Sequence, residues 1–256
     1  VTLQSTGADL ALDNTVTSDV GDVTLLADTG VAAADLITGA DNVSITAGGA
    51  VAVDDITATA GDVNVSTTGA FTNAALVQAL AGNVNISADT GITTTGNVDA
   101  NDALTFVSAG TIQTIGTIEG ATVNIESTGA DLNIDNTVNA TTGNATLIAD
   151  TDINAANTIT AVDVATLTAG NDITLADEVT ADTITLTSLG NMIVEELDAA
   201  TTITASSGGT FQNTAAVDAD AGAVTIQSVG TTTTDGTVAG NSVNIESTTA
   251  DLDINN

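Results

Sequence analysis

The stretch VNIESTGADLNIDNTV, from Val123 to Val138, occurs three times in the chain with small changes. It returns as VNIESTTADLDINN at Val243–Asn256, and an earlier form, VTLQSTGADLALDNTV, occupies Val1–Val16. The three copies begin 122 and 120 residues apart, which is far longer than any single turn, strand or helix of a small domain. Such a spacing indicates a repeat architecture that is assembled from smaller units.

The smaller unit is about 20 residues long. A motif of an apolar, a small polar and an apolar residue recurs every 19 to 22 residues, beginning at Val1, Val23, Val43, Val63, Val84, Leu104, Val123, Ala145, Ala165, Ile184, Ile203, Val224 and Val243. All 26 flanking positions are Ala, Val, Leu, Ile or Phe, and all thirteen middle positions are Thr, Ser or Asn. Alternation with a period of two predicts a strand that buries one face.

Two further apolar columns follow in each unit. The second column stands eight or nine residues after the motif begins, at Leu10, Val31, Val51, Phe71, Ile92, Ile112, Leu132, Ile153, Ile173, Met192, Phe211, Thr232 and Leu252. The third precedes the next motif by five to seven residues, at Val16, Leu36, Ile56, Val77, Val98, Ile118, Val138, Ile159, Val179, Leu197, Val217 and Val238. Only Thr232 is polar, so each unit offers three short strands with one buried face apiece.

We therefore predict an all-β fold: a single right-handed parallel β-helix, or β-solenoid, with about 20 residues and three short strands per coil and about 12–13 coils. Each strand then pairs with its equivalent in the next coil about 4.8 Å away, and like side chains stack; the right hand is expected for parallel strand connections. Strict period two and abundant Thr and Val argue against a helical repeat.

The repeats predict one continuous solenoid over 1–256, with six-coil superrepeats at about 1–122 and 123–242 and the start of a third at 243–256. Within one repeat we expect a set of inward side chains, Val123, Ile125, Leu132, Ile134 and Val138. Asn124 and Glu126 should point outward.

The composition restricts the chemistry. The 256 residues include no Lys, Arg, His, Cys, Pro, Trp or Tyr, and the 33 carboxylates give a formal net charge of −33. Without His or Cys there is no imidazole- or thiolate-based nucleophile or metal site. Without Lys or Arg the field repels nucleic acid and phosphate groups. No apolar run approaches the ~20 residues of a membrane helix. We expect a protein that is not an enzyme, binds no nucleic acid and does not insert into a membrane.

Several segments resemble a known family. SAGTIQTIGTIEG (Ser108–Gly120), TAGNDITLADEVTA (Thr168–Ala181) and SLGNMIVEELDA (Ser188–Ala199) are similar to the repeats of filamentous haemagglutinin-type adhesins. Those are giant bacterial surface proteins whose shafts are right-handed parallel β-helices. The resemblance implies a structural rod or shaft segment of a long fibre or adhesin, located extracellularly or at the cell surface. Its partners would be further copies of the same repeat, in a longer chain or an end-to-end filament.

The carboxylates form candidate cation sites. Asp131, Asp152 and Asp172 precede the second strand in three successive coils, and two weaker pairs follow third-strand aliphatic residues, Asp99 with Glu119 and Asp198 with Asp218. Oxygen ligands of this kind favour Ca²⁺. No cofactor is required by this interpretation, and Ca²⁺ is the cation that such sites would bind. Before the first strand, charge alternates with amide in the series Asp22, Asn42, Asp62 and Asn83.

Other functions stay open. An acidic calcium- or surface-binding solenoid is the main alternative to a shaft. Ice binding is a further one, because Thr-x-Thr pairs occur at Thr166/Thr168 and Thr185/Thr187. A polysaccharide-active β-helix would use two carboxylates about 5–10 Å apart, but the chain has no Trp or Tyr to form a sugar platform. Finally, Phe71, Phe106 and Phe211 are expected in the core, out of reach of chymotrypsin.

Overall fold

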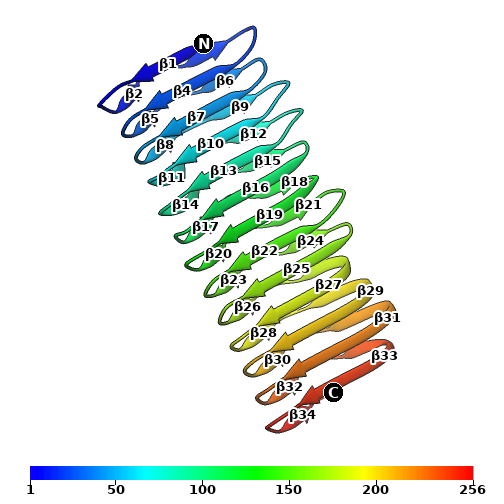
Figure 1. Cartoon of the computed structure of the whole chain (residues 1–256). Helices are drawn as coiled ribbons and strands as arrows, with labels where there is room; N and C mark the ends of the chain where they lie inside the picture. Colours follow the sequence, from blue (N-terminus) through cyan, green and yellow to red (C-terminus); the bar gives the residue numbers. More distant parts are fainter. Residues whose placement is uncertain (256) are drawn as a thin grey trace. The chain divides into compact units, whose positions relative to one another are not determined.

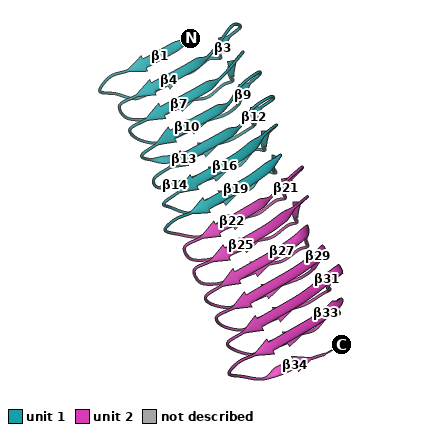
Figure 2. Ribbon diagram, turned by 45° about the vertical axis from the view of Figure 1, so that its right-hand side comes forward, with its two compact units in different colours: residues 1–129 teal, residues 130–256 magenta. Residues whose placement is uncertain are grey.

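The computed structural model describes residues 1–255, which are built from strands and turns without any helix. Parallel strands stack as a β-solenoid of about 13 turns with roughly 20 residues per turn, as the sequence predicts. None of the described residues belongs to a helix long and apolar enough to cross a membrane. The strands form two compact units, residues 1–129 and 130–256 (Figure 2).

Unit 1 contains three columns of parallel strands (Figure 1). The first-strand column is β1 (Thr2–Ser5), β4 (Val23–Ala27), β7 (Val43–Ala47), β10 (Val63–Thr67), β13 (Val84–Ala88), β16 (Ala103–Ser108) and β19 (Thr122–Ser127). The second-strand column is β2 (Leu10–Leu12), β5 (Val31–Ala33), β8 (Val51–Val53), β11 (Ala70–Asn73), β14 (Gly91–Thr94) and β17 (Ile112–Thr114). The third-strand column is β3 (Val16–Ser18), β6 (Ile37–Gly39), β9 (Ile56–Ala58), β12 (Val77–Ala79), β15 (Val98–Ala100) and β18 (Ile118–Gly120).

Unit 2 repeats this plan. Its second-strand column is β20 (Leu132–Ile134), β23 (Ile153–Ala155), β26 (Ile173–Leu175), β28 (Met192–Val194), β30 (Phe211–Asn213), β32 (Thr232–Thr234) and β34 (Leu252–Ile254). Separate third and first strands occur at β21 (Val138–Ala140), β22 (Ala145–Ala149), β24 (Ile159–Ala161) and β25 (Val164–Ala169). Farther along, each third strand continues into the next first strand, giving β27 (Val179–Ser188), β29 (Leu197–Ser207), β31 (Val217–Ser228) and β33 (Val238–Ser247).

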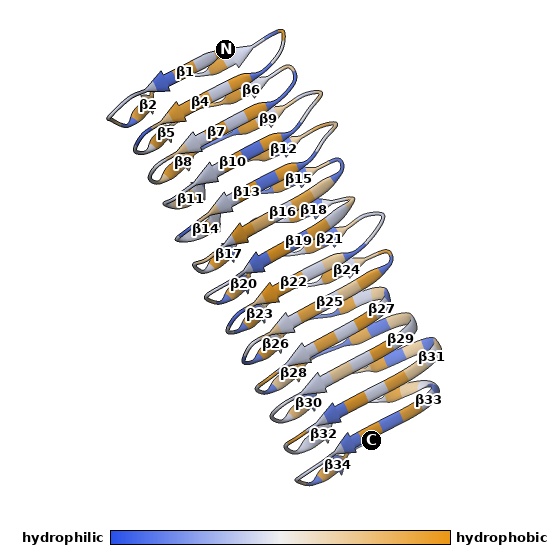
Figure 3. Cartoon of the chain, in the orientation of Figure 1, coloured by the Kyte–Doolittle hydropathy of each residue, from blue (hydrophilic) through white to orange (hydrophobic). Residues whose placement is uncertain are grey.

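The core consists of stacked aliphatic side chains. Along β10 the pattern is buried, half-buried, buried, exposed, buried, which is the expected alternation. Figure 3 shows this alternation as changes of colour along the strands. The predicted inward set, Val123, Ile125, Leu132, Ile134 and Val138, is buried, while Asn124 and Glu126 lie half-buried on the outer face. All three phenylalanines are fully buried as well. The inward set and the core location of the phenylalanines are confirmed, and resistance to chymotrypsin stays a prediction.

One member of the third column was assigned wrongly from the sequence. The inward residue of that turn is Ile37, which pairs with Val16 and Ile56, whereas Leu36 is half-buried and lies just before β6. The loop between the second and third strands is one residue longer in this turn than in the next. A fixed spacing from the second strand therefore points to Leu36 instead of Ile37. Because strand faces alternate, a slip of one residue exchanges inside for outside.

Polar side chains also enter the core. At the corner between the first and second strands, Ser127 Oγ donates to the carbonyl of Gly110 at 3.0 Å, and Ser108 Oγ accepts the N–H of Gly110 at 3.1 Å. Thr232 is fully buried, and its hydroxyl contacts Ser228 Oγ at 2.7 Å. The serine hydroxyls pair with backbone groups of the tight turns, and Thr232 is bonded through the hydroxyl of Ser228.

Candidate functional site

The residues predicted to bind calcium do lie in successive turns of unit 2. Asp131, Asp152 and Asp172 each precede a second strand, and the strands pair with Leu132 opposite Ile153 and Ile153 opposite Ile173. The parallel pairing therefore places the three carboxylates along one edge of the second-strand column. The position of these residues is as the sequence predicts.

The carboxylates have an additional role that the sequence did not reveal. The backbone N–H of Asp172 donates to Oδ1 of Asp152 at 2.9 Å, and the side-chain amide of Asn171 donates to the same oxygen at 2.8 Å. Oδ1 of Asp131 likewise accepts the N–H of Asp152 at 3.3 Å and the hydroxyl of Thr151. Each carboxylate thus accepts hydrogen bonds from the next turn.

The series continues from Asp172 to Asn191, which carries no charge. The N–H of Asn191 donates to Oδ1 of Asp172 at 2.6 Å, and Oδ1 of Asn191 accepts the N–H of Thr210 at 3.0 Å. We call Asp131, Asp152, Asp172 and Asn191 the Asp131 ladder. Because Asn and Asp both present Oδ1, either residue can occupy a position of the ladder.

A second ladder occurs in unit 1 and explains the alternating series noted in the sequence. In this Asp22 ladder, Oδ1 of Asp22, Asn42 and Asp62 accepts the backbone N–H of the equivalent residue one turn later, at 3.0, 2.8 and 2.8 Å. The last member, Asn83, accepts the N–H of Ala103 at 3.0 Å. The Asp and Asn side chains of these turns therefore accept hydrogen bonds from backbone N–H groups that the strands do not pair.

These hydrogen bonds stabilise the ionised form of two carboxyl groups. The backbone N–H of Asn42, and then its side-chain amide, hold the pKa of Asp22 below its ordinary value of 3.8. The hydroxyl of Thr29 and the N–H of Gly30 lower the pKa of Asp9 in the same way. Both shifts follow from hydrogen bonding to the charged form.

The two weaker candidate pairs also lie in register on the outer face of the third strands. Asp99 on β15 pairs with Glu119 on β18, and Asp198 on β29 pairs with Asp218 on β31; all four are half-buried. Oδ2 of Asp99 accepts the amide of Gln78 at 3.1 Å. Within residues 1–255, no group of three or more His, Cys, Asp or Glu side chains is arranged to hold a metal ion. Calcium binding stays a prediction.

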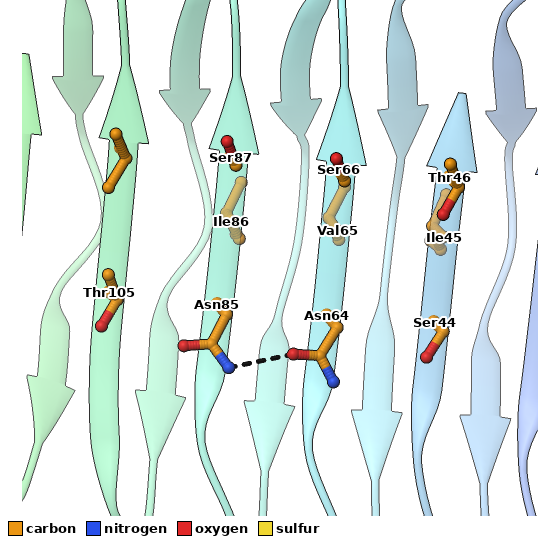
Figure 4. Close-up of a pocket in the computed structure, with 11 residues that line it drawn as sticks. Ser44, Ile45, Thr46, Asn64, Val65, Ser66, Asn85, Ile86, Ser87 and Thr105 are labelled. Carbon is orange, nitrogen blue, oxygen red and sulfur yellow. Dashed lines mark hydrogen bonds between the residues drawn. The ribbon is translucent and has the colours of Figure 1, made fainter. Parts of the chain in front are cut away.

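A shallow groove of about 450 Å³ crosses the outer face of four first strands in unit 1. It was not predicted. Its polar lining comes from β7, β10, β13 and β16 and comprises Ser44, Thr46, Asn64, Ser66, Asn85, Ser87 and Thr105. Figure 4 shows these side chains on neighbouring strands, with the amide of Asn85 donating to Oδ1 of Asn64 at 2.9 Å. The groove has no carboxylate in its lining, in contrast to the ladders.

A buried polar column lies inside unit 1. Asn73, Thr94 and Thr114 occupy the inward end of successive second strands, and each is at most 2% exposed. Oδ1 of Asn73 and the hydroxyls of Thr94 and Thr114 have no hydrogen-bond partner among the described residues. The alternation along the second strands places these three positions inward. The prediction of the core rested on apolar columns and therefore did not include these polar residues.

The geometry defines the class: a parallel β-solenoid repeat protein whose turns are joined by side-chain ladders. Comparison with protein-family models, with curated proteins and with solved structures finds no match.

Proposed function

We propose that the chain is a structural spacer, a shaft segment of a longer extracellular or cell-surface fibre of the adhesin type. The observation that carries the proposal is the repetition of one bonding scheme from turn to turn, in which the same strands and the same turn ladders recur. A stack of equivalent turns can be lengthened without redesign, because each turn contacts only its neighbours.

The chemistry of the surface supports the same proposal. With no Lys, Arg or His, the 33 carboxylates of the chain meet no basic side chain, so neighbouring shafts of this composition repel one another and stay separate. The absence of Lys and Arg removes every trypsin site, and the three buried phenylalanines remove the best chymotrypsin sites. Both properties suit a fibre that is exposed outside a cell.

The spacer proposal makes a prediction about deletions. Removing residues 43–62 takes out one whole turn and joins Asn42 to Val63, so that a first strand again follows its normal turn. We expect this variant to fold, with a melting temperature close to that of the full chain and a stack shortened by about 4.8 Å in small-angle scattering.

The matched control removes residues 43–52, which is half a turn. It joins Asn42, in the turn that precedes a first strand, to Val53 at the end of a second strand, and so prevents the columns from stacking in register. Equal stability of the two deletion variants would contradict the modular construction on which the spacer proposal depends. The location is tested separately, by whether an antibody against the folded chain labels intact source cells.

A further inference from the structure

The outer face of the first strands of unit 2 carries an ordered array of threonines. Parallel pairing places Thr146 opposite Thr166, Thr166 opposite Thr185, Thr185 opposite Thr204, and Thr204 opposite Thr225. One threonine therefore stands at the same outward position in five successive turns, on β22, β25, β27, β29 and β31. Figure 1 shows these strands running side by side.

A second column runs parallel to the first, two residues further along each strand. Its middle three members are Thr168, Thr187 and Ser206, which are paired in register. The ends of this column are Ile148 and Gln227. We call the two columns together the threonine face. The register shifts of β27–β29 and β29–β31 lie at the corner before the threonine face, so the rows within it are regular.

The threonine face is uncharged, although the chain carries 33 carboxylates. None of its ten outward positions in these five turns is Asp or Glu, and seven are Thr. On the outer face of the third strands of the same unit, Asp198 and Asp218 stand in adjacent turns. The corresponding first-strand face of unit 1 has only four Thr in fourteen positions, and the groove described above interrupts it with Asn and Ser. The threonine face is thus distinct from the other surfaces of the chain.

The pattern has a defined geometry in two directions. Rows repeat at the strand spacing of about 4.8 Å, and the two columns are separated by two residues, about 6.5 Å along the strand. A threonine side chain is branched at Cβ and has few rotamers, so its methyl and hydroxyl groups are held in place before anything binds. Hydroxyl groups at regular intervals order the first layer of water, and ordered water bridges two surfaces almost as well as direct hydrogen bonds do.

We propose that the threonine face binds ice. The oxygen lattice of ice presents uncharged repeats of about this size in two directions, which matches the two columns and the absence of charge. A single glycan chain fits the observations less well, because sugar platforms are aromatic and the chain has no Trp or Tyr and only buried Phe. The activity is independent of the spacer function, since it requires the outer face of one unit only.

The test uses the full chain and measures thermal hysteresis and inhibition of ice recrystallisation. Thr185→Lys places a long charged side chain at the centre of the threonine face, and we expect most of the hysteresis to be lost. The control is Thr174→Lys on β26, which adds the same charge at a half-buried position on the outer face of the second strands of unit 2. It should leave the activity unchanged, and both variants should melt close to the wild type.

Thr185→Ala repeats the test with a smaller side chain, in case the lysine variant does not fold; we expect it to lower the hysteresis as well. The proposal is overturned if the wild-type chain shows no hysteresis, or if the Thr174 and Thr185 variants behave alike. Adsorption to insoluble cellulose or chitin that depends on Thr185, without hysteresis, would also overturn it and would assign the face to a neutral polysaccharide.

Discussion

Replacing Asp152 tests whether the Asp131 ladder holds the turns of unit 2 together. Asp152→Ala removes the oxygen that accepts the backbone N–H of Asp172 at 2.9 Å and the side-chain amide of Asn171 at 2.8 Å. Asp152→Asn keeps an Oδ1 acceptor in the same place, as Asn191 does two positions later in the Asp131 ladder. Both variants remove the same negative charge, so the comparison between them isolates the hydrogen bonds.

The expected magnitude follows from these contacts. Two hydrogen bonds at a half-exposed edge contribute about 1–2 kcal/mol together, because water replaces part of each lost interaction. Removing the charge relieves repulsion of about 1 kcal/mol from each neighbouring carboxylate one turn away, if the groups are solvated. We therefore expect Asp152→Asn to be as stable as the wild type or more so. Asp152→Ala should be about 1–2 kcal/mol less stable than Asp152→Asn.

Thermal melting followed by circular dichroism measures the difference. For a chain of this size 1 kcal/mol corresponds to about 2–4 °C, so the two variants should differ by about 2–8 °C. Asp150 provides the control, since it is exposed and takes no part in the Asp131 ladder. Asp150→Ala and Asp150→Asn should melt alike. Equal melting of the two Asp152 variants would refute the assignment of a stabilising role to the ladder.

Four further outcomes are expected. Thr94→Val should raise the urea midpoint by an amount equivalent to about 1 kcal/mol, because it removes a buried hydroxyl without a partner; a lower midpoint would show that the hydroxyl is satisfied. Native chain should resist chymotrypsin, and rapid cleavage after the buried phenylalanines would show that the solenoid is not closed around them. The lowered pKa values of Asp9 and Asp22 stabilise the fold above their unfolded value near 3.8 and lose this contribution as the pH falls through the lower folded values; urea midpoints measured from pH 5 downward should fall less steeply for Asp22→Asn. Millimolar Ca²⁺ should raise the melting temperature more than sodium chloride of equal ionic strength, because Ca²⁺ at a hundred times its Kd adds about 2.7 kcal/mol to the free energy of unfolding. Asp152→Asn should reduce this effect, and equal shifts with both salts would exclude a specific calcium site.

The strands and their inward residues could be predicted because stacking imposes the same requirement in every turn. Val123 and Ile125 are buried for the same reason as Val63 and Val65, and the period of two identifies all of them. Thr94 was not recognised as a buried polar residue, since threonine also suits the outer face of a strand.

The turns were harder to predict than the strands. The sequence placed Asp152 at its edge correctly, but it could not show that Oδ1 faces the N–H of the next turn, because this depends on the local backbone conformation. The groove beside Asn64 and Asn85 was missed for a related reason, since each first strand on its own is an ordinary half-buried strand.

The turn ladders give the stack a direction. In both ladders the side-chain oxygen belongs to the earlier turn and the N–H belongs to the later one. Wherever such a stack is interrupted, the surface facing the C-terminus offers acceptor oxygens and the surface facing the N-terminus offers N–H donors. Two surfaces of the same kind cannot satisfy each other, whereas unlike surfaces can. Any end-to-end joining of these stacks through the ladders must therefore be head-to-tail, and a contact of that kind does not close on itself unless a rotation forms a ring. Head-to-tail joining without ring closure would give a filament in which all subunits point the same way.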